Sequence, residues 1–171
     1  MKKILIFLLT VILVLSFAGC GIEDGPKKET IGTSSVEKVT EEKFLLNETA
    51  VFEDLKITAT EIKETSGESF FEPEEGNVFV GINFTIENIS SETQTISSLL
   101  LFEAYADDIK CDYSFTAACA FDNGTLDGEL AAGKKMVGWY AVEVPRDWSN
   151  IEIEGKSSWL SDNSAKFVFE K

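Results

Sequence analysis

The stretch that decides the fold is residues 76–88, which read Gly-Asn-Val-Phe-Val-Gly-Ile-Asn-Phe-Thr-Ile-Glu-Asn. Every second residue from Val78 to Ile86 is apolar, so an extended chain places these side chains on one face of a sheet. The opposite face begins with Phe79 and becomes polar by Glu87, as in an antiparallel strand with one face partly in water. We therefore expect a core strand here, which the other strands of the chain cover.

The rest of the chain after residue 44 consists of short segments with strand character, separated by turn residues. Eight or nine such segments without a convincing amphipathic helix predict an all-β protein, an antiparallel β-sandwich of two sheets. The apolar phase slips between Ala59 and Ile62, which predicts a bulge or the end of that strand. Asp107-Asp108 predicts a tight hairpin turn. The expected strands are 49–52, 55–62, 76–88, 94–97, 99–106, 109–115, 134–144, 150–154 and 166–169.

The N-terminus begins with Lys2 and Lys3, followed by an apolar run from Ile4 to Phe17. A helix of this run would be about 21 Å long, too short for the roughly 30 Å hydrocarbon core of a membrane. We therefore interpret residues 1–19 as a secretory signal peptide and not as a spanning helix.

The end of this run, Phe17-Ala18-Gly19-Cys20, resembles the lipobox of bacterial lipoproteins, although Leu is commonest where Phe17 stands. The resemblance implies that Cys20 receives a diacylglycerol and becomes the N-terminus after cleavage. Two acyl chains anchor a protein stably, at about 0.8 kcal/mol per buried methylene. We expect this lipid to hold the protein on the outer face of the cell membrane; a plain signal peptide with a coincidental cysteine is the alternative.

Residues 20–43 are dominated by Gly, Ser, Thr and Glu, and their few apolar residues follow no sustained period. This composition is typical of a disordered linker, which would hold the domain at roughly 25 Å from the lipid. A short helix over 36–44 is the alternative. The predicted organisation is a signal peptide (1–19), a lipidated cysteine with its linker (20–43) and a sandwich domain (44–171).

Removal of Lys2 and Lys3 leaves 13 of the 15 basic side chains against 30 acidic ones, a formal charge of −17. So acidic a surface repels phosphate backbones and anionic headgroups, so we expect no nucleic-acid partner and no membrane docking through a basic face. The chain has no histidine, which excludes Ser-His-Asp and Cys-His catalysis and most zinc sites. We expect a protein that is not an enzyme and needs no cofactor.

Cys111 and Cys119 are the thiols that remain after lipidation of Cys20. A disulfide between them would close a short loop and contribute about 2.5 kcal/mol in the chain-entropy model. A continuous strand would hold the two residues about 26 Å apart, so the disulfide requires a turn between them, around 114–117. Two buried free thiols are the alternative.

Two loops carry the candidate contact residues, because the loops of a sandwich cluster at its ends on a rigid scaffold. The first, 64–76, contains Phe70 and Phe71, and we expect at least one of these rings to pack against the sandwich. The second lies within 117–128, which fits either a helical turn or a loop. The candidate residues are Phe70, Phe71, Glu72, Glu74 and Glu75 in the first loop, and Asp122 and Asp127 in the second.

The acidic residues of these loops have alternative interpretations. Glu72, Glu74 and Glu75 could supply calcium ligands or the acid and base of a glycosidase, but chance clustering among 30 acidic residues explains them better. The large aromatic side chains fit either the core of a small sandwich or the floor of a sugar-binding groove, and the core is the commoner place. They are Trp139, Tyr140, Trp148 and Trp159.

Several strand and turn motifs together resemble the DUF4352 family. They are Asn77-Val78-Phe79-Val80, Ile86-Glu87-Asn88, Leu130-Ala-Ala-Gly-Lys-Lys135, Gly138-Trp139 and Val144-Pro145. That family has an immunoglobulin-like domain, found in secreted and lipid-anchored proteins mainly of Gram-positive bacteria, and in overall plan the chain is similar to the mycobacterial secreted antigen MPT63. The similarity covers roughly residues 48–169, and Ala132 stands where the family usually has proline. It implies architecture and an extracytoplasmic setting, and it brings no catalytic residues.

The sequence therefore predicts a lipid-anchored, immunoglobulin-like module that binds a surface protein or another envelope component. The alternative is a surface receptor lipoprotein for a solute or for calcium.

Overall fold

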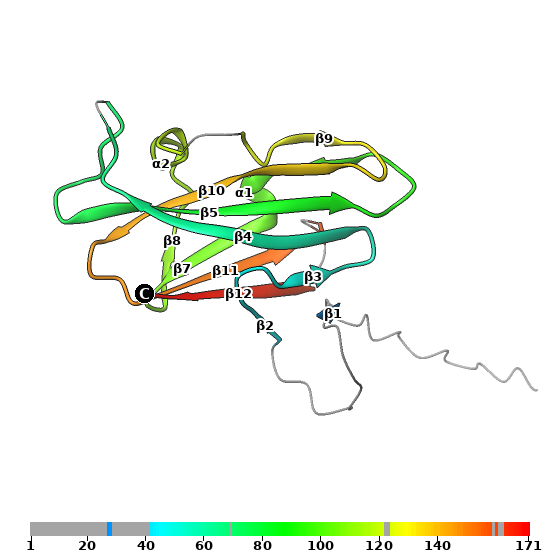
Figure 1. Cartoon of the computed structure of the whole chain (residues 1–171), viewed down its shortest axis with the longest axis horizontal. Helices are drawn as coiled ribbons and strands as arrows, with labels where there is room; N and C mark the ends of the chain where they lie inside the picture. The colour runs from blue at the N-terminus through cyan, green and yellow to red at the C-terminus, as the bar shows by residue number, and fades with distance from the viewer. Residues whose placement is uncertain (1–26, 29–41, 69, 122–123, 159, 161–162) are drawn as a thin grey trace, which may run out of the picture.

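The structure is a computed structural model, and it describes residues 27–28, 42–68, 70–121, 124–158, 160 and 163–171. Two five-stranded sheets pack face to face, and a two-stranded ribbon lies beside them (Figure 1). The first sheet has the order β1 (Lys27–Lys28), β3 (Thr49–Val51), β4 (Leu55–Thr65), β5 (Asn77–Asn88), β10 (Lys135–Pro145). The second has the order β2 (Lys43–Phe44), β12 (Ser164–Glu170), β11 (Asn150–Lys156), β7 (Phe102–Ala106), β8 (Ile109–Cys111). The ribbon pairs β6 (Gln94–Ile96) with β9 (Gly128–Leu130). The predicted β-sandwich is confirmed.

The strand β5 lies between β4 and β10 and is antiparallel to both, and its apolar face is the centre of the core. The alternating residues predicted for that face are at most 1% exposed; they are Val78, Val80, Ile82, Phe84 and Ile86. From the second sheet, Phe102 stacks on Phe84 with ring centroids 4.7 Å apart, and Phe167 meets the same ring edge-on at 5.3 Å. These rings join the two sheets.

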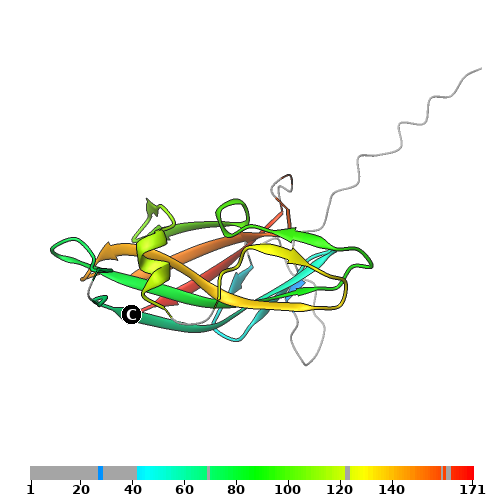
Figure 2. The ribbon, with the colours of Figure 1, turned by 90° about the horizontal axis from the view of Figure 1, so that it is seen from above.

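The opposite face of β5, expected to be partly wet, is covered at one end. Phe79 is fully buried and packs with Ala117 and Ala141 in a second apolar cluster, beneath the short helix α2 (Phe115–Cys119). Figure 2 shows α2 lying over β5 and β10. Ser114 starts this helix, because its Oγ accepts a hydrogen bond from Ala117 N (3.1 Å). The helical turn left open within 117–128 therefore forms, and it begins slightly earlier.

Several boundaries differ from the prediction. The helix α1 (Ser98–Leu101) occupies the start of the expected strand 99–106, so that β7 begins only at Phe102. The strand β8 ends at Cys111, and α2 follows where a strand to residue 115 was expected. The predicted slip in β4 is a register shift between Ala59 and Glu61. Asp107 and Asp108 have φ values of 48° and 66°, as a tight hairpin turn requires, so both predictions are confirmed.

The N-terminal part of the described chain joins both sheets. Lys27–Lys28, within the predicted linker, pairs antiparallel with β3 as β1, and β2 pairs with β12 in parallel. Phe44 in β2 is fully buried. The predicted signal peptide, Cys20 and the rest of the linker lie outside the described residues. Within the described part of the chain, no helix is both long and apolar enough to span a membrane.

Candidate functional site

The loop between β4 and β5, residues 66–76, has a tightly closed tip. Glu68 and Phe71 exchange two backbone hydrogen bonds, Glu68 N to Phe71 O (3.1 Å) and Phe71 N to Glu68 O (3.0 Å). Gly67 has a φ of 74°, and a Cβ on it would lie 1.7 Å from Phe71 O, so only glycine fits there. Its amide donates to Thr65 Oγ1 (3.1 Å). Glu68 and Phe71 are therefore held next to each other at the tip.

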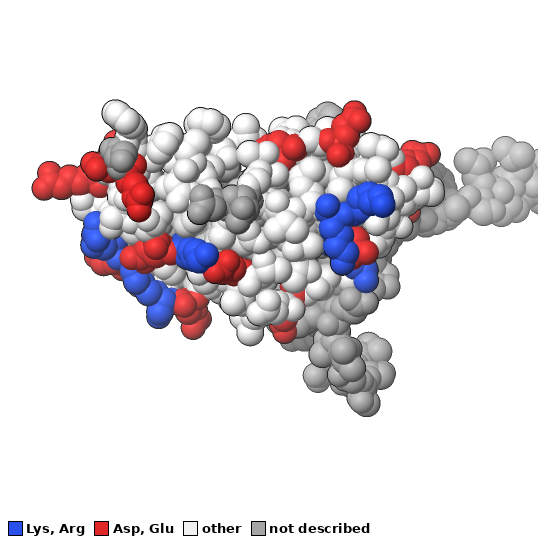
Figure 3. Space-filling view, turned by 45° about the horizontal axis from the view of Figure 1, so that its top comes forward, with Lys and Arg blue, Asp and Glu red and all other residues white. Residues whose placement is uncertain are grey.

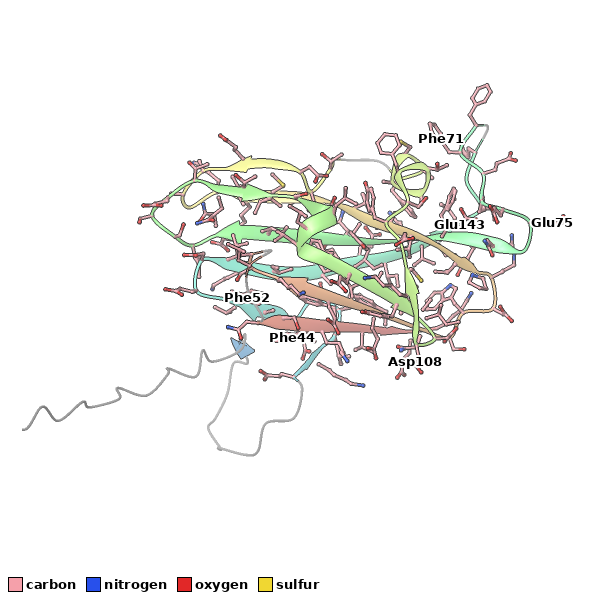
Figure 4. The ribbon with its side chains drawn as sticks, turned by 180° about the vertical axis from the view of Figure 1, so that it is seen from behind. Phe44, Phe52, Phe71, Glu75, Asp108 and Glu143 are labelled. Atoms are coloured by element: carbon pink, nitrogen blue, oxygen red, sulfur yellow. The ribbon has the colours of Figure 1, made fainter. Side chains whose placement is uncertain are left out.

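The base of the same loop is braced by β10 and the residue that follows it. The Glu143 carboxylate accepts hydrogen bonds from Glu74 N (2.7 Å) and from Asn77 Nδ2 (2.9 Å). Arg146 N donates to Gly76 O (3.0 Å). Figure 4 shows Phe71, Glu75 and Glu143 at the same end of the sandwich, with Phe71 beyond the sheets. Tip and base together fix the loop as a projection from a rigid scaffold.

The two phenylalanines of this loop do not pack into the sandwich. Phe70 is 95% exposed and Phe71 is 40% exposed, so the expectation that one ring would be covered is wrong. The reason is the closed turn, which bonds the tip to itself and directs it away from the core. Four exposed glutamates surround the rings in the sequence: Glu68, Glu72, Glu74 and Glu75.

The second predicted loop has a different role. The Asp127 carboxylate accepts hydrogen bonds from Ser98 N (2.9 Å) and Ser98 Oγ (3.0 Å), so it ties this loop to the start of α1. Asp127 lies toward the Lys135 end of β10, since the neighbouring Gly128 approaches Met136, whereas the hairpin loop lies at the Pro145 end. The structure therefore does not bring the two sets of candidate residues together. Asp122 lies outside the described residues.

A cavity that the sequence did not predict lies on the outer face of β4, β5 and β10. It has a volume of about 390 Å³. Its lining residues come from β4 (Glu61, Lys63, Glu64, Thr65), β5 (Asn83), β10 (Trp139) and the segment after α2 (Ala120, Phe121). Figure 3 shows this side of the molecule, where many of the charged side chains lie toward its left and right ends.

Two glycines allow the segment after α2 to lie directly on the sheet. A Cβ on Gly81 would come 2.8 Å from the ring of Phe121, and one on Gly138 would come 2.9 Å from the backbone of Thr125. Phe121 thereby stacks on Trp139, with ring centroids 5.0 Å apart. Both residues line the cavity. Glycines inside two strands, at positions 81 and 138, are the feature of the sequence that could have indicated this packing.

The large aromatic residues divide between the two faces. Tyr140 and Trp148 are 2% and 5% exposed and belong to the core, as the commoner interpretation predicted. Burial raises the pKa of Tyr140 well above its ordinary value. Trp139, also buried, lies on the outer face beside the cavity. Trp159 lies outside the described residues.

The two cysteines lie on different elements, Cys111 at the end of β8 and Cys119 at the end of α2, and both are free thiols in the structure. Cys111 is half-buried, and burial raises its pKa, whereas Cys119 is exposed. The alternative of two buried thiols therefore does not fit Cys119. A disulfide between them stays a prediction.

The described residues contain no group of three or more Asp, Glu, Cys or His side chains placed to hold a metal ion. The glutamates of the hairpin loop are therefore not gathered around a common point as calcium ligands would be.

Comparisons with solved structures show the fold. The crystal structure of the candidate lipoprotein YcdA from Bacillus subtilis matches with a TM-score of 0.55 at 14% identity, over 68% of this chain and 36% of that one. This chain thus spans about a third of YcdA. A β-sandwich protein from Clostridium difficile matches with a TM-score of 0.52 at 14% identity, over 81% of this chain and all of that one.

The secreted protein MPT63 of Mycobacterium tuberculosis matches with a TM-score of 0.52 at 12% identity, over 78% of this chain and 100% of that one. A search of the curated proteins found no match. The model of one family, described as a domain of unknown function (DUF4352), matches residues 44–166, nearly the whole sandwich. By that match, which covers most of the chain, the protein belongs to the DUF4352 family.

Proposed function

We propose that this chain is a non-enzymatic module, anchored by a diacylglycerol on Cys20 to the outer face of the cell membrane, whose hairpin loop 66–76 binds a protein partner. The lipobox-like end of the signal sequence supports the anchor. The structural neighbours, one a candidate lipoprotein and one a secreted protein, are in keeping with an extracytoplasmic setting.

The observation that carries the binding proposal is the exposure of Phe70 on a braced loop. A phenylalanine that is 95% exposed gains about 1.5–3 kcal/mol when a partner buries it. The loop below it is already fixed by the Glu68–Phe71 turn and by Glu143, so little conformational entropy is lost on binding. Aromatic side chains presented in this way are the usual anchors of protein interfaces.

The charges around the ring indicate which surface charge the partner should carry. The exposed Glu68, Glu72, Glu74 and Glu75 flank the two rings, and no described residue forms an ion pair with any of them. A complementary surface has an apolar pocket for Phe70 with Lys or Arg side chains at its border. An anionic lipid surface does not fit, because the glutamates would be repelled from it.

The test is chemical cross-linking in cells of the source organism that carry the tagged full-length chain. We expect one protein to be recovered with the wild-type chain and to be lost with Phe70→Ala. Phe115→Ala is the matched control, because Phe115 on α2 is 72% exposed but lies outside the loop. Without cross-linking, less partner should be recovered with the chain at about 1 M salt. The Debye length is then about 3 Å, so the attraction between the glutamates and a basic partner is screened.

Equal recovery with Phe70→Ala and wild type would refute the role of the loop, as would the absence of any specific partner. The anchor is tested separately by Cys20→Ser. This variant should appear in the culture medium or stay as an unprocessed precursor, while the wild-type chain fractionates with membranes.

A further inference from the structure

The strand β1 ties the predicted linker to the sandwich close to the predicted anchor. Lys27–Lys28 pairs antiparallel with β3. Cys20 precedes Lys27 by seven positions and Lys43 in β2 by 23. A fully extended chain spans at most about 25 Å over the shorter of these segments and about 80 Å over the longer one. The paired strand therefore limits how far the sandwich can lie from Cys20.

The strand β1 lies at the end of the sandwich opposite to the hairpin loop 66–76. Its partner Ala50 in β3 pairs in turn with Ile57, near the start of β4. The hairpin loop follows Thr65, the last residue of the same strand. Figure 1 shows β1 at the right of the molecule and the hairpin loop at the left. The tether and the proposed binding loop therefore leave the sandwich at opposite ends.

The tether is too short for the sandwich to stand on its hairpin loop. From Ile57 to Thr65 a strand rises about 26 Å, at about 3.3 Å per residue. The loop adds to this distance, because Phe71 lies beyond the sheets in Figure 4. With the loop on the membrane and the sandwich upright, β1 would stand more than about 26 Å above the lipid. A tether of at most about 25 Å does not reach that height.

The charge of the hairpin loop opposes an orientation in which the sandwich lies on its side. The loop carries four exposed glutamates, Glu68, Glu72, Glu74 and Glu75. Anionic headgroups repel these side chains, so the free energy is lower when the loop is away from the lipid. The length of the tether and the charge of the loop are independent observations, and both favour the same orientation.

We infer that the sandwich stands on the membrane with the β1 end toward the lipid and the hairpin loop 66–76 pointing away from it. This inference rests on the proposed anchor at Cys20. It specifies the partner of the loop further: the basic surface that receives Phe70 lies outside the lipid headgroups, about 26 Å or more above the level of β1. A partner surface within the plane of the membrane does not fit.

The test is energy transfer from one fluorophore on the chain to labelled lipid headgroups. The chain is purified from membranes with its lipid and added to preformed vesicles of phosphatidylcholine and phosphatidylglycerol that contain the acceptor lipid. The fluorophore is attached at Glu53→Cys, in the exposed turn before β4, or at Glu75→Cys in the hairpin loop, with Cys111→Ala and Cys119→Ala in both chains. We expect at least about twofold more transfer from position 53, because the two positions differ by about 26 Å in height.

The double variant Lys27→Pro/Lys28→Pro tests the role of β1. Proline has no amide hydrogen, so this variant cannot donate hydrogen bonds to β3. Because β1 is a two-residue edge strand, the thermal midpoint should stay close to that of the wild type. The tether then extends to Lys43, and the transfer from the two positions should become similar. The matched control is Ser34→Pro/Ser35→Pro, which follows β1 in the sequence, leaves the segment from Cys20 to β1 unchanged and should keep the contrast.

Two results would overturn the inference without touching the role of Phe70 in partner capture. One is equal transfer from positions 53 and 75 in the chain with β1 intact. The other is a contrast that persists in Lys27→Pro/Lys28→Pro, since the tether would then not be its cause. A chain that is recovered without lipid, as seen in the mass of its N-terminal peptide, would instead refute the anchor at Cys20, and the inference with it.

Discussion

At the scale of single residues, Glu64 links the end of β4 to the C-terminus. Its carboxylate accepts hydrogen bonds from Lys171 Nζ (2.8 Å) and from Trp148 Nε1 (3.1 Å), and the same ammonium lies 4.9 Å from the centre of the Trp148 ring. The hydrogen bond from Lys171 is the largest cause that holds the pKa of Glu64 below its ordinary value, and burial opposes it. The ionised form is therefore the one that the folded protein stabilises.

The lowered pKa predicts how the contribution of Glu64 depends on pH. A carboxylate with a depressed pKa stabilises the fold above its ordinary pKa of 4.5, and this stability is lost as the pH falls through the lower, folded value. We expect Glu64→Gln to be less stable than the wild type at pH 7, with a difference that shrinks below pH 4.5. Urea unfolding at a series of pH values measures it, and a difference that is constant down to pH 2 would contradict the assignment.

The two thiols should differ in reactivity. The thiolate is the reactive form, and Cys111 is half-buried with a raised pKa, whereas Cys119 is exposed at the end of α2. We expect iodoacetamide to modify Cys119 of the folded chain well before Cys111, as followed by peptide mass spectrometry. In urea the two rates should become similar. Protection of both cysteines until a reductant is added would instead establish the disulfide.

At the scale of elements, the turn of the β7–β8 hairpin has two roles: it reverses the chain, and it bonds to the start of β11. Asp107 and Asp108 both have positive φ, which suits a tight turn between twisted strands. The Asp107 carboxylate also accepts from Ser149 N (3.1 Å) and Asn150 N (2.9 Å), so it holds the start of β11. The sequence predicted the turn but gave no sign of this second contact, because its partners lie more than forty residues away.

This difference separates two neighbouring substitutions. Glycine adopts positive φ without strain, so Asp108→Gly should change the free energy of unfolding by no more than about 0.5 kcal/mol. Asp107→Gly keeps the same backbone freedom but loses the hydrogen bonds to β11, and it should destabilise the protein by about 1–3 kcal/mol. Urea denaturation of both variants measures the contrast. Equal effects would show that the carboxylate of Asp107 adds nothing to the turn.

The elements also show which features a sequence can reveal. The strand β5 was predicted well because its alternation from Val78 to Ile86 is long and uninterrupted. The helix α1 was missed. Leu99 and Leu100 are apolar and were therefore assigned to a strand, although they are 66% and 57% exposed in α1. Its position depends on the Asp127 carboxylate, which bonds to Ser98 across 29 residues of sequence. Local pattern carries no information on such a contact.

At the scale of the whole molecule, the same limit applies to the candidate site. The sequence correctly selected the acidic hairpin as a loop, but the exposure of Phe70 depends on the closed turn at Glu68 and Phe71. The cavity on the outer face requires the segment after α2 to lie on the sheet, which in turn requires bare backbone at Gly81 and Gly138. Both features arise from tertiary packing between residues that are remote in the chain.

In the sandwich, the phenylalanines that stabilise the core differ from the exposed phenylalanine that is available to a partner. Phe84, fully buried, contacts the rings of Phe102 and Phe167 from the second sheet, whereas Phe70 contacts solvent over 95% of its surface. Phe84→Ala should therefore destabilise the protein by about 3–5 kcal/mol through lost burial and a cavity between the sheets. Phe70→Ala should leave stability within about 0.5 kcal/mol of the wild type. Thermal unfolding of the full-length chain compares them, and a Phe70→Ala variant that unfolds early would mean that the loop belongs to the core and not to a binding surface.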